Sequence, residues 1–98
     1  MKEFVVDGNN FEDTEGFYCE MDKLLTKNLS FETGHNYEAF NDLLRGGFGM
    51  FDIGEPILIK WINYDKSKND LGNEVILTLL EIILDFNNSG HKCRLELY

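Results

Sequence analysis

The feature that most constrains this 98-residue chain is the apolar run "PILIKWI" at residues 56–62, which lies between segments of helical periodicity. Pro56 suits the first position of a strand, where its missing N–H costs no ladder hydrogen bond. A nearly continuous apolar run is typical of a strand that is covered on both faces, as in parallel sheets. We therefore expect the run to form a strand of a parallel sheet.

Two further segments predict strands. "KEFVV" at residues 2–6 is followed by the turn signal Asp7-Gly8, and "CRLELY" at residues 93–98 alternates apolar and polar residues. With the helical segments between them, the order is strand, helix, helix, strand, helix, strand. Such crossovers join parallel strands and are almost always right-handed. The chain is long enough for one domain, so we expect residues 1–98 to form a single α/β domain with a three-stranded parallel sheet.

Three segments show apolar residues one and two helical turns apart. The first runs from a cap at Asp13 or Thr14 through Leu29, and the second begins after Asn36, a good N-cap. Gly46 can take the left-handed conformation that ends this second helix. The expected buried stripe of the second helix is Tyr37, Phe40, Leu43 and Leu44.

The third helical segment, residues 74–88, is the most apolar, and Gly90 fits the position just past its end. Its expected core face is Val75, Ile76, Leu79, Leu80 and Ile83. Polar residues recur every three or four positions along it and form a narrow wet stripe that includes Thr78, Glu81 and Asp85. In the polar stretch before this segment, residues 63–72, we expect a short helical turn.

The charge of the chain argues against nucleic acid as a partner. Eighteen acidic residues face nine basic ones, a formal net charge of −9, whereas nucleic-acid binding relies on Lys and Arg. Residues 30–55 have a net charge of −4 and residues 73–88 one of −3, so the negative charge is concentrated in two segments. This pattern favours a basic partner. No run approaches the ~18–20 apolar residues of a membrane span, and no signal peptide is evident, so we expect a cytosolic protein.

The cysteines and acids show no metal-binding spacing. Cys19 and Cys93 share no short motif, and a cytosolic chain usually keeps such residues as buried thiols, although a disulfide between them is an alternative. Asp52, Asp65 and Asp70 lack the spacing of a calcium loop. The sequence therefore predicts neither a metal nor another cofactor.

The second helix carries polar residues opposite its apolar stripe, namely Glu38, Asn41 and Asp42. Carboxylates at i and i+4 place their Cβ atoms about 5–6 Å apart, close to a phosphate repeat. The Arg and Lys side chains with which a nuclease holds phosphates would pair with them. A solvated helix face is the alternative interpretation. Arg45 lies one turn from Asp42, where a salt bridge or a favourable charge at the helix end is expected.

The segments "GHNYEAFNDLLRGGFG" (34–49) and "EPILIKW" (55–61), with the long helix and terminal strand after them, resemble the barstar family of intracellular ribonuclease inhibitors. The resemblance covers essentially the whole chain, and its specific part is the pattern N-x-x-A-hydrophobic-x-D-hydrophobic-hydrophobic-x-G beginning at Asn36. The "RGGFG" ending resembles a subgroup of the family rather than barstar itself. The resemblance implies a barstar-like fold, with strand order 1-2-3 and about three to four helices.

The resemblance also implies a mechanism, in which an acidic helix and its adjacent loop enter a ribonuclease active site and replace RNA phosphates by carboxylates. Asp42 matches the central aspartate of the family, and Glu38 matches a contact aspartate one turn earlier. Either Glu81 or Asp85 matches the carboxylate on the last long helix. The partner-binding residues expected on this basis are Glu38, Asn41, Asp42, Arg45, Gly47, Phe48, Glu81 and Asp85.

Two departures from barstar bear on the target. Asn41 stands where barstar has a tryptophan, and Gly47 with Phe48 replaces another tryptophan in the loop. These differences leave the fold unaffected but make barnase itself a doubtful target. Phe48 is either a plug of the core or an exposed anchor for the partner. Glu81 and Asp85 are either contacts or part of a solvated stripe.

The expected function is that of an antidote which binds a basic ribonuclease or ribonuclease-like toxin and is monomeric when free. The alternative is a non-inhibitory interaction domain that binds another basic protein, or associates with itself through the apolar helix 74–88. An enzyme is not expected. His35 precedes the acidic helix, and no second His or Lys stands nearby to complete an acid–base set.

Overall fold

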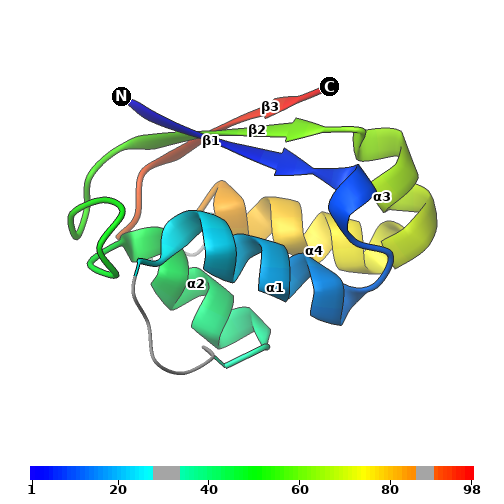
Figure 1. The fold of residues 1–98 in the computed structure, drawn as a ribbon, viewed down its shortest axis with the longest axis horizontal. Coiled ribbons are helices and arrows are strands. Elements are labelled where there is room, and N and C mark those ends of the chain that lie inside the picture. The colour runs from blue at the N-terminus through cyan, green and yellow to red at the C-terminus, as the bar shows by residue number, and fades with distance from the viewer. Residues whose placement is uncertain (28–33, 86–89) are drawn as a thin grey trace.

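The computed structural model describes residues 1–27, 34–85 and 90–98 (Figure 1). In this part of the chain, three strands form one sheet: β1 (Lys2–Asp7), β2 (Ile57–Ile62) and β3 (Cys93–Leu97). The described helices are the short 3-10 helix η1 (Gly8–Asn10), α1 (Thr14–Leu25), α2 (Tyr37–Arg45), α3 (Tyr64–Leu71) and α4 (Asn73–Ile83).

All three strands are parallel, in the order β1-β2-β3, with Lys2 beside Ile57 and Ile57 beside Cys93. This confirms the predicted α/β class and strand order. Figure 1 shows the helices packed on one face of the sheet. The expectation that β2 is covered on both faces is therefore wrong.

Buried and partly exposed residues alternate along β2, which explains why its sequence wrongly suggested a strand covered on both faces. Ile57, Ile59 and Trp61 face the helices and are fully buried, whereas the residues between them are partly exposed. One of the latter is Lys60, whose Nζ lies 3.2 Å from a carboxylate oxygen of Glu3 on the neighbouring strand. The apolar residues that flank Lys60 made a one-sided strand look continuous.

An aromatic cluster occupies the core around Trp61. The Trp61 ring stacks on Phe17 of α1, with centroids 5.3 Å apart, and forms a T-shaped pair with Tyr64, with centroids 5.5 Å apart. The indole Nε1–H donates to the hydroxyl oxygen of Ser67 at 3.0 Å, and both side chains are fully buried. The aromatic cluster thus joins the sheet to α1 and α3.

The helix starts follow the predicted caps. A side-chain oxygen of Asp13 accepts from the Gly16 amide at 2.7 Å, and one of Asn36 accepts from the Ala39 amide at 2.8 Å. The first helix ends at Leu25, and the expected position Leu29 lies outside the described residues.

The buried stripe of α2 is confirmed except at one residue. Phe40, Leu43 and Leu44 are buried, but Tyr37 is 41% exposed, so its expected burial is wrong. Tyr37 is the first residue of α2, and no preceding turn of the helix covers it. Helical periodicity alone therefore predicts one buried residue too many, at the first position of α2.

The region between β2 and α4 is more helical than expected, because α3 has eight residues rather than a single turn. It is anchored by Lys66, whose ammonium donates to the carbonyl oxygens of Gly8 and Phe11 at 3.2 and 3.0 Å. Lys66 also forms an ion pair with Asp70 one turn later, at 2.6 Å. These polar contacts hold a helix that has little apolar periodicity.

The last helix is shorter than expected. α4 ends at Ile83, and Asp85 adopts a positive φ of 55° in the turn that follows. Gly90 therefore does not stand just past the helix, and part of the predicted span, residues 86–89, lies outside the described residues. Of the expected core face, Ile76, Leu79 and Ile83 are buried, whereas Val75 and Leu80 are partly buried.

Gly46 ends α2 with a φ of 90°, a conformation that favours glycine. A Cβ atom here would lie 2.5 Å from the carbonyl oxygen of Asp52 and 2.7 Å from the ring of Phe51. We expect Gly46→Ala to lower the free energy of unfolding by more than about 2 kcal/mol, since strain and overpacking add. Urea denaturation followed by circular dichroism measures this change.

Gly54 in the same loop is the matched control for this prediction. Its φ is also positive, at 76°, but a Cβ atom at this position would have no described neighbour within 4 Å. Gly54→Ala therefore isolates the backbone strain and should cost about 1 kcal/mol. Equal losses for the two variants would show that the contacts of Gly46 do not matter.

Candidate partner-binding site

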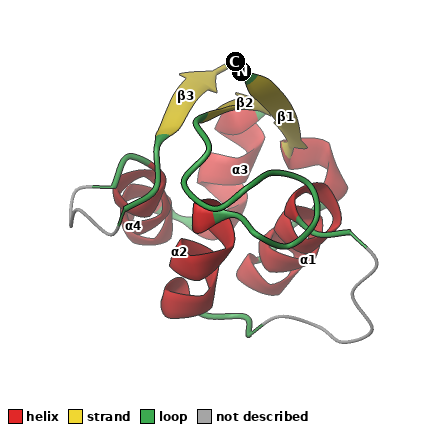
Figure 2. Cartoon of the chain, turned by 90° about the vertical axis from the view of Figure 1, so that its left-hand side faces the viewer, coloured by secondary structure: helices red, strands yellow, loops and turns green. Residues whose placement is uncertain are grey.

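A groove with a volume of about 290 Å³ lies between α2 and α4. These two helices pack side by side beneath the sheet (Figure 2). Three residues of α2 and four from α4 and its following turn line the groove: Tyr37, Glu38, Asn41, Thr78, Glu81, Ile82 and Asp85. Three of these seven described residues are acidic and none is basic. We call this feature the acidic groove.

The α2 wall of the acidic groove follows from the amphipathic pattern of this helix. Phe40, Leu43 and Leu44 point into the core, which leaves Glu38 and Asn41 to line the groove. Glu38 lies in the first turn of α2, where the helix dipole favours a negative charge. The carboxylate is therefore placed at little cost to the helix.

The other wall is the polar stripe of α4. Thr78, Glu81 and Asp85 follow one another at intervals of one turn, and the hydroxyl of Thr78 donates to the carbonyl oxygen of Glu74 at 3.0 Å. Both candidates for the second acidic contact, Glu81 and Asp85, line the groove. Their position therefore does not distinguish between the two candidates.

A buried histidine anchors the turn that carries Asp85. The Nε2–H of His91 donates to the carbonyl oxygen of Ile82 at 2.7 Å, and its Nδ1 lies 3.9 Å from a carboxylate oxygen of Asp85. The other carboxylate oxygen of Asp85 accepts from the Gly90 amide at 3.2 Å. Sequence reasoning did not identify this role of His91, because the contact with Ile82 depends on how the chain turns back after α4.

The chemistry of the acidic groove suits a single cationic side chain. Glu38, Glu81 and Asp85 carry like charges, whose mutual repulsion a bound cation would relieve. An Arg guanidinium presents five N–H donors in one plane and pairs well with carboxylates. Tyr37 and Ile82 supply apolar surface for the stem of such a side chain.

Asp42 and Arg45 lie outside the acidic groove, on the exposed surface of α2. The Asp42 carboxylate is 64% exposed, and one of its oxygens lies 3.7 Å from Nη1 of Arg45. A surface pair of this kind stabilises a protein by only about 0–1 kcal/mol. Asp42 is thus available to a partner at little cost to the fold.

The loop after α2 brings a further apolar residue to the surface. Phe48 is partly buried and packs against the core, which favours its interpretation as a core plug. Gly47 is exposed, and its amide donates to the carbonyl oxygen of Phe51 at 2.9 Å. Ile53 in the same loop is apolar and 80% exposed, and its side chain lies close to Gly47.

The structure thus gathers four of the eight predicted site residues in the acidic groove: Glu38, Asn41, Glu81 and Asp85. Asp42, Arg45, Gly47 and Phe48 do not line it. Sequence reasoning missed Tyr37, Ile82 and Ile53 as exposed or lining residues. Thr78 carried a usable signal, because it lies in the polar stripe of α4, but the exposure of one isoleucine in a loop leaves no such pattern.

The two cysteines are both thiols. The expectation that both are buried is wrong for Cys19, which is exposed, and holds only in part for Cys93, which is partly buried. Burial raises the pKa of the Cys93 thiol, and the nearby negative charge of Asp85 adds a smaller increase. Together they bring this pKa to about 12. Since the thiolate is the reactive form, Cys93 should react about 10³-fold more slowly than an unperturbed thiol at pH 8.

This difference predicts selective labelling. Iodoacetamide at pH 8 should modify Cys19 and leave Cys93 unmodified in the folded protein, as mass spectrometry of the peptides measures. In guanidinium chloride, both thiols should react. Rapid labelling of Cys93 in the folded protein would contradict its burial.

The comparison with known protein families agrees with the fold. The family model described as Barstar (barnase inhibitor) matches residues 1–97. No curated protein matches the chain. No helix in the described ranges is long and apolar enough to cross a membrane. The assignment to an "RGGFG" subgroup stays a prediction. With a match over nearly its whole length, the chain belongs to the barstar family.

Proposed function

We propose that this protein inhibits a basic ribonuclease or ribonuclease-like toxin by placing α2 and the acidic groove against the active site of that enzyme. The observation that carries the proposal is the gathering of Glu38, Glu81 and Asp85 in one groove, with no basic residue among its described lining residues. The family supports it, because its members are ribonuclease inhibitors rather than enzymes.

In this proposal, the carboxylates replace RNA phosphates. A nuclease cleft holds phosphates with Arg and Lys, and one such side chain enters the acidic groove. Asp42, one turn beyond Glu38, projects from the exposed surface of α2 and takes the central position. The loop with Gly47 and Ile53 supplies shape and apolar contact. We further propose that the protein acts in the cytosol and is monomeric when free.

Association should be fast and should weaken with salt, because the net charge of −9 attracts a basic partner. The barnase–barstar complex is itself the standard example of such electrostatic steering, and this expectation is carried over from it.

An RNA-cleavage assay tests the proposal, with a ribonuclease co-purified with the protein from its source cell. Glu81→Gln should weaken inhibition by about tenfold, equivalent to about 1.4 kcal/mol, because one carboxylate of the groove is lost. Glu74→Gln is the matched control, since Glu74 is exposed on the same helix but does not line the groove. It should change inhibition by less than about twofold.

Equal inhibition by the two variants would show that the acidic groove is not the contact. Binding of a basic protein whose ribonuclease activity is unchanged would instead favour a non-inhibitory interaction domain.

A further inference from the structure

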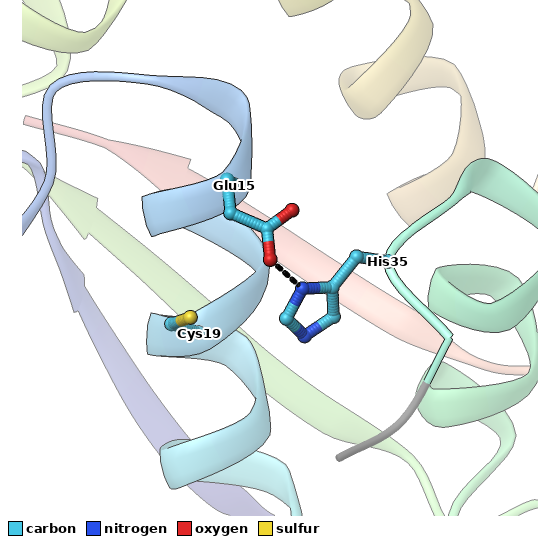
Figure 3. A group of neighbouring side chains, drawn as sticks. All are labelled: Glu15, Cys19 and His35. Atoms are coloured by element: carbon cyan, nitrogen blue, oxygen red, sulfur yellow. Dashed lines mark hydrogen bonds and ion pairs between the residues drawn. The ribbon is translucent and has the colours of Figure 1, made fainter.

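A second group of chemically distinctive side chains joins α1 to the start of α2. Glu15 and Cys19 lie one turn apart on α1, and His35 directly precedes the N-cap of α2. The three potential ligand atoms are a Glu15 carboxylate oxygen, Cys19 Sγ and a ring nitrogen of His35, all within 4.8 Å of one another. Figure 3 shows the His35 ring beside the turns of α1 that carry the other two residues.

The His35 ring is held in place on several sides. Its Nε2 lies 3.0 Å from a carboxylate oxygen of Asp22, and its Nδ1 contacts a carboxylate oxygen of Glu15. The ring also stacks on Tyr18, with centroids 5.6 Å apart and an interplanar angle of 25°. Only 10% of the side chain is exposed. The ring therefore presents Nδ1 to Glu15 in a defined orientation, close to Cys19.

The contact with Asp22 has a direct counterpart in metalloproteins. A histidine that binds a metal through one nitrogen usually donates its other N–H to a carboxylate, which orients the ring and raises its basicity. Here, Asp22 accepts from Nε2–H while Nδ1 contacts Glu15, and Cys19 Sγ lies close to both residues. Without a metal, a protonated His35 between two carboxylates accounts for the same geometry, and its pKa is raised by Asp22 and then Glu15.

We propose that Glu15, Cys19 and His35 bind a divalent transition-metal ion of the zinc class. A thiolate, an imidazole and a carboxylate are the ligand types that Zn²⁺ takes in proteins, whereas Ca²⁺ and Mg²⁺ require oxygen ligands. Three protein ligands leave one position of a tetrahedral ion for water. Binding releases the Cys19 thiol proton and any proton on His35 Nδ1 to solvent.

The sequence predicted no metal site because no two of these residues except Glu15 and Cys19 are close along the chain. The fold brings His35 to them by packing α2 beside α1. A bound ion would connect α1 to the residue directly before Asn36, the N-cap of the helix that carries Glu38 and Asp42. It would thereby stabilise the folded protein and the start of the proposed inhibitory helix.

Cobalt titration of the reduced, chelator-treated protein tests the proposal. One equivalent of Co²⁺ should produce a thiolate-to-cobalt charge-transfer band and the visible bands of a tetrahedral ion. Cys19→Ser should abolish the charge-transfer band, and this exposed position should tolerate the change. Cys93→Ser is the matched control and should retain the band, because Cys93 lies on β3 and does not belong to the group of Glu15, Cys19 and His35.

Zn²⁺ supplies a second measurement on the same variants. It should raise the melting temperature of the wild type and of Cys93→Ser but not of Cys19→Ser, and it should slow alkylation of Cys19 at least tenfold. Absence of the cobalt bands, or a charge-transfer band or thermal shift that persists in Cys19→Ser, would overturn the proposal. His35 would then be an ion-pair partner of Glu15 and Asp22 only.

Discussion

Replacing Trp61 by alanine is expected to lower the free energy of unfolding by about 3–5 kcal/mol, the range found for large aromatic side chains removed from cores. Trp61 has no exposed surface, and its ring stacks on Phe17. Its removal leaves a cavity and deprives the buried Ser67 hydroxyl of the indole N–H at 3.0 Å. Small proteins have only about 5–15 kcal/mol of stability, so much of the total would be lost.

Guanidinium denaturation followed by far-ultraviolet circular dichroism measures this loss without the tryptophan signal. Trp61→Phe keeps an aromatic ring and should cost less than Trp61→Ala. Leu77→Ala is the surface control, because Leu77 is 58% exposed on α4, and it should change stability by no more than about 0.5 kcal/mol. A loss below about 1 kcal/mol for Trp61→Ala would contradict the central place of Trp61 in the core.

The second large effect concerns binding. If the proposed function is correct, Asp42→Ala should weaken inhibition of the cognate ribonuclease by at least about 100-fold, equivalent to about 2.7 kcal/mol. The cation that the nuclease uses for phosphate would lose its counter-charge in the complex. The central aspartate of barstar is a binding hot spot of this kind, and the expectation for Asp42 is carried over from that residue. Folding should be unchanged, since the pair with Arg45 is exposed.

Asp65→Ala is the control that distinguishes the effect of the position of Asp42 from the effect of losing one negative charge. Asp65 is an exposed carboxylate in the first turn of α3, far from α2 in Figure 1, and its removal changes the net charge equally. It should weaken inhibition by less than about threefold, through slower association alone. Inhibition constants at two ionic strengths measure both effects. If Asp42→Ala inhibits as well as Asp65→Ala, the proposed mimicry of phosphate by α2 is wrong.

Local chemistry explains which parts of the fold the sequence could predict. Asp13 and Asn36 were predictable caps because each accepts from an amide three residues later. The side of the sheet on which helices pack depends on the whole chain, so the run 56–62 was misjudged as covered on both faces. The end of α4 at Ile83 was missed for a related reason, since the apolar pattern continues beyond the helix.

The candidate site divides in the same way. Glu38, Glu81 and Asp85 were identified as polar residues on two helices, but only the packing of α2 on α4 places them in one groove. Spacing rules could not identify the group around His35, because Glu15 and Cys19 lie on α1 whereas His35 lies directly before the N-cap of α2. Pattern alone therefore identified candidate side chains, and tertiary packing determined which of them meet.

The parallel sheet also bears on how the chain reaches its folded state. Within the described ranges, β1 and β3 each pair with β2 alone, so each strand pair joins segments that are separated by two α-helices. Neither pair is a hairpin that forms locally within microseconds. Closing these long loops costs entropy before the strand contacts repay it, which slows folding relative to an all-helical bundle of similar size. Because both strand pairs include β2, neither pair can form before this middle strand docks.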